Sequence, residues 1–101
     1  AAPGQAPRVS IVVPLYRTLR FLRFQLAAFA RDPEVRGAAD LVFVLDSPEQ
    51  RAEVEPLLRG LSALHGGLPL RLAVMPANRG YAAACNAGAA LARADTLLFL
   101  N

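Results

Sequence analysis

The sequence predicts an α/β fold, a three-layer and mostly parallel doubly wound sheet. Short runs of β-branched and other apolar residues, such as RVSIVVP and DLVFVLD, are typical of strands buried on both faces, which occur in parallel sheets covered by helices. These runs alternate with segments of helical spacing in the order βαβαβαβ, and the turns between them are short. The 101 residues suit one domain, and a hydrophobic content of 54% excludes disorder.

The first strand is expected at 8–14, closed by Pro14. Thr18 is the candidate N-cap of the first helix, and Asp32-Pro33 is its expected stop. Apolar residues at helical spacing lie between them, at Leu19, Leu22, Leu26 and Phe29.

The second strand, DLVFVLD, is expected to end at Asp46. The following SPEQ predicts a helix start in which Ser47 caps, Pro48 takes the first helical position and Gln50 closes a capping box. HGG ends this helix, with glycine supplying a left-handed turn. Its apolar stripe is Val54, Leu57, Leu58, Leu61 and Leu64.

The third strand is expected at 70–76, the third helix at 80–94 and the fourth strand at 96–100. After that strand the α/β pattern would supply a loop or helix, so we expect 1–101 to be the first part of a larger domain, with 1–7 as a flexible lead-in.

The charge and the cysteine content limit which kinds of binding partner and which cellular compartment are expected. All eleven basic residues are Arg, scattered among acids to a net charge of +3, and no basic-aromatic strand motif accompanies them, so we predict no nucleic-acid partner. The apolar runs are shorter than a membrane span, and the start lacks signal-peptide character. Cys85 is the single cysteine, which fits a reducing compartment and thus the cytoplasm, with the cytoplasmic face of a membrane as an alternative.

In open α/β sheets the ligand binds outside the carboxyl ends of the strands. Asp46 lies at such an end, where a carboxylate can accept hydrogen bonds from a uracil or thymine imide or from ribose; its alternative role is a helix-start charge. Tyr16, in PLYR after the first strand, offers a ring for stacking on a base, although an ordinary loop tyrosine would look the same.

The stretch NRGYAAACNAG, residues 78–88, precedes and opens the third helix. Gly80 lets the backbone turn or approach a ligand closely, and alanines 82–84 allow the helix to lie near the sheet. Asn78 either caps this helix or serves the ligand. Asn86, if buried inside the helix, needs hydrogen-bond partners in a neighbouring or ligand-binding loop.

The chain has neither GxGxxG after the first strand nor GxxxxGK[ST], so the common backbone cradles for phosphate are missing. A nucleotide bound here needs another phosphate partner, for which a divalent metal held by carboxylates beyond the fourth strand would serve.

Together these segments resemble the N-terminal half of a family 2 glycosyltransferase, an inverting sugar transferase of the GT-A type fold. The matching segments, in order, are VSIVVPLYR, LVFVLDSPEQ, NRGYAAACNAG and TLLFLN. The resemblance implies that the nucleotide-binding residues are Pro14, Leu15, Tyr16, Asp46, Arg79, Gly80 and Asn86. Asn101 falls where the first aspartate of the family's metal motif is often found.

The resemblance also implies Mg²⁺ or Mn²⁺, a nucleotide-diphosphate sugar with UDP or dTDP favoured, and a glycan or lipid-linked acceptor with a reacting hydroxyl. The second metal-motif aspartate and the catalytic base would lie beyond Asn101, so this chain alone is expected to be inactive. Where the family commonly has two acids followed by serine, only Asp46 precedes SPE here, so the base contact rests on one carboxylate.

Three other interpretations stay open. A stand-alone flavodoxin-like or receiver-like binding module shares the alternating pattern, but VVPLYR lacks the acidic pair of a receiver. A nucleotidyltransferase would show a glycine- and lysine-rich loop, and this chain has no lysine. A transferase-like protein that has lost activity and only binds or scaffolds is the third.

Overall fold

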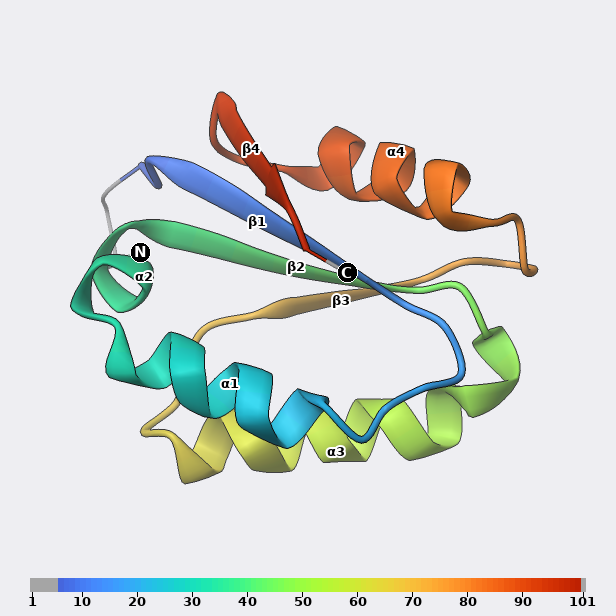
Figure 1. Cartoon of the computed structure of the whole chain (residues 1–101), viewed down its shortest axis with the longest axis horizontal. Helices are drawn as coiled ribbons and strands as arrows, with labels where there is room; N and C mark the ends of the chain where they lie inside the picture. Colours follow the sequence, from blue (N-terminus) through green and yellow to red (C-terminus); the bar gives the residue numbers. More distant parts are fainter. Residues whose placement is uncertain (1–5, 101) are drawn as a thin grey trace.

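The computed structural model describes residues 6–100, where four parallel strands form one sheet between two layers of helices (Figure 1). The strand order is β3-β2-β1-β4, which confirms the predicted three-layer parallel architecture. The expectations for residues 1–5 and for Asn101 lie outside the described residues. The elements are β1 (Val9–Leu15), α1 (Leu22–Arg31), α2 (Pro33–Ala38), β2 (Ala39–Leu45), the 3-10 helix η1 (Pro48–Gln50), α3 (Arg51–Leu64), β3 (Arg71–Val74), α4 (Tyr81–Leu91) and β4 (Thr96–Phe99).

Alternation along the strands builds a core on each face of the sheet. The larger core joins one face of the sheet to α1 and α3, and Phe43, Leu26 and Leu58 are fully or almost fully buried in it. The smaller core lies under α4, where Ala84 packs with Val12 and Val44. In Figure 1, α4 accordingly lies on one side of the sheet, and α1, α2 and α3 lie on the other.

The four strands differ in how well they are covered. β2 pairs with β1 from Val9↔Ala39 to Leu15↔Leu45 and is buried along its whole length, as DLVFVLD predicts. The edge strand β4 pairs with β1 from Val9↔Thr96 to Val12↔Phe99, and all four of its residues are exposed. No helix within residues 6–100 is long and apolar enough to cross a bilayer.

The region around α1 differs from the expectation. α1 begins at Leu22, and Thr18 does not cap it, because Arg17 adopts a left-handed conformation (φ 61°) and redirects the chain before the helix starts. Asp32-Pro33 does stop α1, but it also starts an unpredicted helix, α2, in which the Asp32 side chain accepts hydrogen bonds from the first-turn amides and Pro33 takes the first position.

The predicted capping box after β2 is also wrong. Ser47 makes no cap bond; it is buried and bonds to the Gln50 side chain, and the backbone forms η1 before α3 begins. In α3, Val54, Leu58 and Leu61 are buried as the stripe predicts, but Leu64 is 73% exposed because it lies in the last turn. The predicted glycine turn is confirmed by positive φ angles at Gly66 and Gly67.

The close approach of α4 to the sheet depends on Gly88 more than on the alanines. A Cβ at Gly88 would overlap Val12 Cγ1 and lie 3.2 Å from Val44 Cγ2. Of the three alanines, Ala84 is fully buried, whereas Ala82 is exposed. The helix therefore lies against the valines through one small buried face.

Candidate functional site: a pocket at the carboxyl end of the sheet

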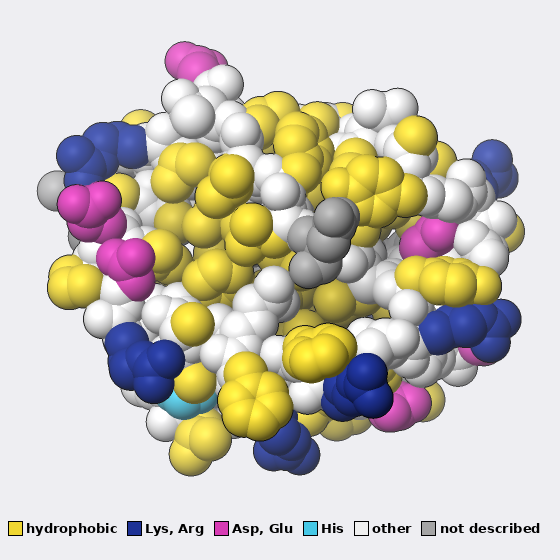
Figure 2. Space-filling model, viewed as in Figure 1, with side chains coloured by type: hydrophobic (Ala, Val, Ile, Leu, Met, Phe, Trp, Pro, Cys, Tyr) yellow, Lys and Arg dark blue, Asp and Glu magenta, His cyan; other side chains and the backbone are white. Residues whose placement is uncertain are grey.

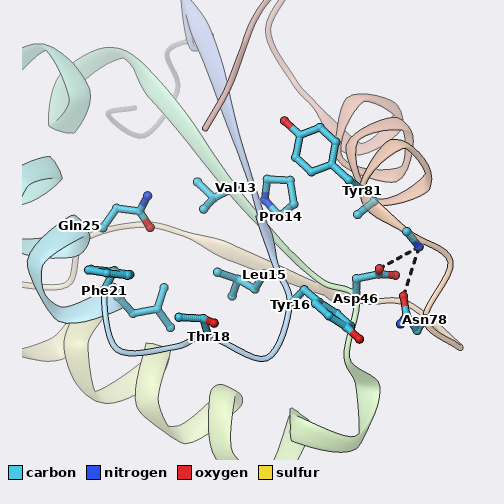
Figure 3. Close-up of a pocket in the computed structure, with 13 residues that line it drawn as sticks. Val13, Pro14, Leu15, Tyr16, Thr18, Phe21, Gln25, Asp46, Asn78 and Tyr81 are labelled. Carbon is cyan, nitrogen blue, oxygen red and sulfur yellow. Dashed lines mark hydrogen bonds between the residues drawn. The ribbon is translucent and has the colours of Figure 1, made fainter. Parts of the chain in front are cut away.

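The strand order reverses at β1. The chain runs outward from β1 to β2 and β3, and α4 then returns it to β4 on the other side of β1. Such a reversal leaves a crevice at the carboxyl ends of the strands, where ligands bind in open α/β sheets. A pocket of about 710 Å³ opens there (Figure 3). It is lined by Val13, Pro14, Leu15, Tyr16, Thr18, Phe21, Leu22, Gln25, Asp46, Asn78, Gly80, Tyr81 and Ala84.

Asp46 lies just after β2 and joins the strand to the loop before α4. Its side chain is buried (residue 3% exposed), and its two carboxylate oxygens accept hydrogen bonds from the backbone amides of Arg79 and Gly80, each at 2.9 Å. Gly80 has φ 93°, a backbone conformation that residues with a side chain rarely adopt, which explains why glycine occupies this position. The carboxylate therefore sets the position of the loop as well as lining the pocket.

Asn78 supports the same loop and does not cap α4. Its Oδ1 accepts a hydrogen bond from the Gly80 amide at 3.3 Å, an interaction drawn beside the Asp46 bond in Figure 3. The N-cap position itself belongs to Gly80, which makes no side-chain cap bond. Of the two roles that the sequence left open for Asn78, the structure excludes the helix cap.

The loop after β1 is fixed by Ser47 and Gln50. Ser47 Oγ accepts from the Arg17 amide (3.2 Å) and donates to Gln50 Oε1 (2.6 Å), and Gln50 Nε2 donates to the Arg17 carbonyl (3.1 Å). The Arg17 side chain then holds Tyr16: its Nε donates to the Tyr16 hydroxyl at 2.9 Å, and its guanidinium lies over the ring. The position of Tyr16 is thus set by residues after both β1 and β2.

Three aromatic rings line the pocket. Tyr16, Phe21 and Tyr81 come from the β1 loop, the turn before α1 and the first turn of α4, and each is about half exposed. A hydrogen bond with Cys85 and, next, burial raise the pKa of Tyr81, so its hydroxyl stays protonated at neutral pH. Exposed aromatic faces around one cavity favour a planar ligand that can stack.

The structure brings together most of the predicted site residues. Pro14, Leu15, Tyr16, Asp46 and Gly80 line one pocket. The Arg79 and Asn86 side chains do not line it; Arg79 contributes its amide to the Asp46 contact. Asn86 is exposed in the middle of α4, so water can form hydrogen bonds with its side-chain amide. The expectation that a buried Asn86 needs partners in a neighbouring loop therefore does not apply.

Sequence reasoning missed the pocket residues Phe21, Gln25 and Tyr81. Tyr81 carried a readable signal, because it follows Gly80 directly and opens a helix at the ligand side of the sheet. Phe21 and Gln25 carried none, because their position depends on where α1 begins and on the turn at Arg17.

A second aspartate of β2 holds the other end of α4. Asp40 accepts hydrogen bonds from Ser10 Oγ (2.9 Å), from the Arg93 amide (2.9 Å) and from Arg71 at 2.7–3.2 Å. Arg71 also donates to the Leu91 carbonyl at the end of α4. Burial by itself would raise the pKa of Asp40, but these donors outweigh it and hold the pKa below its usual value.

The described residues include no group of three Asp, Glu, His or Cys side chains arranged to hold a metal ion. Asn101, which the sequence resemblance places at a metal motif, is outside those residues. Within residues 6–100, the pocket is lined by three aromatic rings and the Asp46 carboxylate, and no metal ligand set is present.

The chain shares its parallel sheet, covered by helices on both faces, with GT-A type glycosyltransferases, and solved structures similar to the chain are glycosyltransferases. Staphylococcus aureus TarS superposes with a TM-score of 0.71 at 20% identity, over 92% of this chain and 16% of that one. The mannosyltransferase PcManGT from Pyrobaculum calidifontis, solved with GDP-Man and Mn²⁺, gives a TM-score of 0.70 at 25% identity, over 89% of this chain and 26% of that one.

The chain therefore spans only 16–26% of the length of these structures. No protein-family model and no curated protein matches the sequence.

Proposed function

We propose that this chain is the donor-nucleotide-recognising part of a family 2 glycosyltransferase that moves a sugar from a nucleotide-diphosphate sugar to a hydroxyl acceptor with inversion. The observation that carries the proposal is the buried Asp46 carboxylate beside the exposed rings of Tyr16 and Tyr81 at the switch point of the sheet. The complex of a mannosyltransferase of the same fold with GDP-Man supports a nucleotide-sugar donor.

Four of the pocket residues receive a role in holding the donor. The Tyr16 ring stacks on the base, and Pro14 and Leu15 provide the apolar floor beside it. Each Asp46 oxygen accepts one amide hydrogen and has a further lone pair, which can accept an N–H of the base or a ribose hydroxyl. UDP and dTDP remain the favoured donors; guanine also presents an N–H pair to a carboxylate, so GDP belongs in the test.

The chain is assigned nucleotide recognition and no turnover of its own. The one carboxylate that lines the pocket, within residues 6–100, is Asp46, and it is already bonded to two loop amides and so is poorly suited to deprotonate an acceptor. A divalent metal would neutralise the diphosphate leaving group when bound, but the described residues do not fit such an ion. The catalytic base, the metal ligands and the acceptor site are therefore expected from residues other than 6–100.

The proposal is tested by the affinity for UDP, dTDP, GDP and ADP measured by isothermal titration calorimetry. We expect a dissociation constant on the order of 0.1–1 mM for the preferred nucleotide. Asp46→Asn should weaken it by about tenfold or more, because an amide cannot accept at both positions and a charge-assisted bond is lost. Asp95→Asn, the same substitution at an exposed residue outside the pocket, is the matched control and should stay within about twofold.

A second variant tests recognition of the nucleotide base without disturbing the hydrogen bonds by which Asp46 holds the loop before α4. Tyr16→Ala leaves the Asp46 bonds to the loop in place and removes the stacking ring, so it should also weaken binding by about tenfold. Equal affinity of the Asp46 and Asp95 variants, or no effect of the Tyr16 variant in a folded protein, contradicts the proposed donor site.

A further inference from the structure

The face of α1 that points away from the sheet carries aromatic and basic side chains. We call this surface the α1 outer face: it consists of Arg23, Phe24 and Arg31 on α1, together with Arg20 and Phe21, which directly precede the helix. Phe24 is 74% exposed and Phe21 59%, although large apolar side chains are normally covered. At 100° per residue Phe24 lies opposite the core residues Leu22, Leu26 and Phe29, so it points directly into solvent. Figure 2 shows aromatic side chains ringed by basic ones where α1 lies.

This face carries three basic side chains and no acidic one. No acid occurs between Arg17 and Arg31, and neither Arg20, Arg23 nor Arg31 forms an ion pair with any residue in 6–100. The Arg20 guanidinium instead lies 5.0 Å from the centre of the Phe21 ring.

The neighbouring helix α3 shows what an ordinary solvated face of this protein looks like. There Glu55 pairs with Arg51 at 3.3 Å and with Arg59 at 3.2 Å, so charges of both signs alternate along the helix. The α1 outer face differs from the α3 face in two ways: its charged side chains are all basic, and it carries exposed aromatic rings.

We propose that the α1 outer face docks on a membrane surface rich in anionic phospholipid. Arginines bind lipid phosphates, and phenylalanines enter the region between headgroups and acyl chains. Each basic residue near such a surface adds about fivefold to the affinity. The negative headgroups complement the face, whereas two copies of the face would repel each other, which argues against self-association.

A lipid surface also fits the shape of this face better than a nucleic acid does. Proteins that stack single-stranded bases use a basic groove, whereas here Phe24 projects from the outer side of a single helix. Phe21 belongs to both the α1 outer face and the pocket, so docking brings the pocket mouth close to the headgroups. The inference does not depend on the proposed nucleotide site, and Phe24 does not line that pocket.

The test is co-sedimentation of the 101-residue chain with vesicles of phosphatidylcholine, with and without about 30 mol % phosphatidylserine. We expect binding only to the phosphatidylserine vesicles, and weakening between about 0.1 M and about 0.5 M salt. Arg20→Gln/Arg23→Gln should lower the partition coefficient by about 25-fold, and Phe24→Ser by about tenfold.

The matched control is Arg59→Gln/Arg93→Gln, which removes the same charge from exposed positions elsewhere and should change binding by about twofold or less. Circular dichroism verifies that each variant is folded, and nucleotide affinity of Phe24→Ser verifies that the pocket is intact. Absence of binding by the folded chain, or equal losses in both arginine pairs, overturns the proposal. So does preferential binding of a single-stranded RNA oligonucleotide that vesicles do not displace, or concentration-dependent self-association that requires Phe24.

Discussion

Asp40 in β2 and Asp46 directly after it hold opposite ends of α4. Asp46 accepts from the loop before the helix, and Asp40, through Arg71 and the Arg93 amide, holds its end. Buried carboxylates are costly unless they are fully paired, and here both are bonded by several donors. The position of the pocket loop relative to the sheet therefore depends on two charged residues.

Asp40 gives the residue-scale prediction, which concerns stability against pH. Its folded pKa lies below the unfolded value of about 3.9, so ionised Asp40 stabilises the fold above about pH 4, and this stability is lost as the pH falls through the folded pKa. Asp40→Asn should lower the free energy of unfolding by about 2–3 kcal/mol at neutral pH, because charged hydrogen bonds from Arg71 are lost.

The measurement is urea unfolding of wild type and variant at about pH 7 and about pH 3. The difference between the two proteins should shrink at the lower pH, because about pH 3 lies below the unfolded pKa of Asp40, so folding of the wild type there has to release a proton from this carboxyl group. Asp95→Asn, at an exposed position, serves as the control. A difference that stays constant across the pH range would show that Asp40 does not contribute through its charge.

The sequence singles out the position of Asp46 but not that of Asp40. Asp46 stands at the carboxyl end of a strand, where the fold class itself predicts a ligand site. Asp40 stands at the start of the same strand, and its partner Arg71 is 31 residues away, on a strand whose register no local pattern specifies. Long-range polar pairing of this kind is visible only in the folded structure.

At the scale of elements, the close packing of α4 against the sheet depends on Gly88, which has no side chain and lies on the buried face of the helix. Gly88→Ala should destabilise the protein by about 1–3 kcal/mol, because the added methyl overlaps Val12 and crowds Val44, and moving the helix outward loses core contacts. The same substitution normally improves helix propensity by about 1 kcal/mol.

Gly60→Ala in α3 is the control, since nothing lies within 4 Å of a Cβ there. It should stabilise the protein by up to about 1 kcal/mol. Thermal unfolding of both variants checks the pair. Stabilisation by both substitutions would show that α4 is not held by close packing at Gly88.

The four strands and the three longer helices were predictable because their hydrophobic periodicity is strong. The failures fall where one residue decides the course of the chain. Arg17 adopts a positive φ, which non-glycine residues seldom do, so the late start of α1 has no sequence signature. Asp32-Pro33 is typical both of a helix stop and of a helix start, and the start is the feature that the sequence analysis does not predict.

At the scale of the whole molecule, the order β3-β2-β1-β4 makes the site. It places β1 between β2 and β4 and puts α1 and α4 on opposite faces, so the loops after β1, β2 and β3 meet around one pocket. The sequence predicted alternation and the edge at which ligands bind, and the structure supplied the strand order and the aromatic walls. The fold shared with glycosyltransferase structures agrees with this arrangement.

The most direct test of the nucleotide site is amide chemical-shift mapping of the folded chain during titration with UDP and with GDP. The account predicts that the shifts cluster at Tyr16, Asp46, Gly80 and Tyr81, and that one base gives larger shifts than the other. Shifts confined to another surface, such as the hollow between α3 and β3 near Arg59, or no shifts at millimolar nucleotide in a well-folded protein, would contradict it.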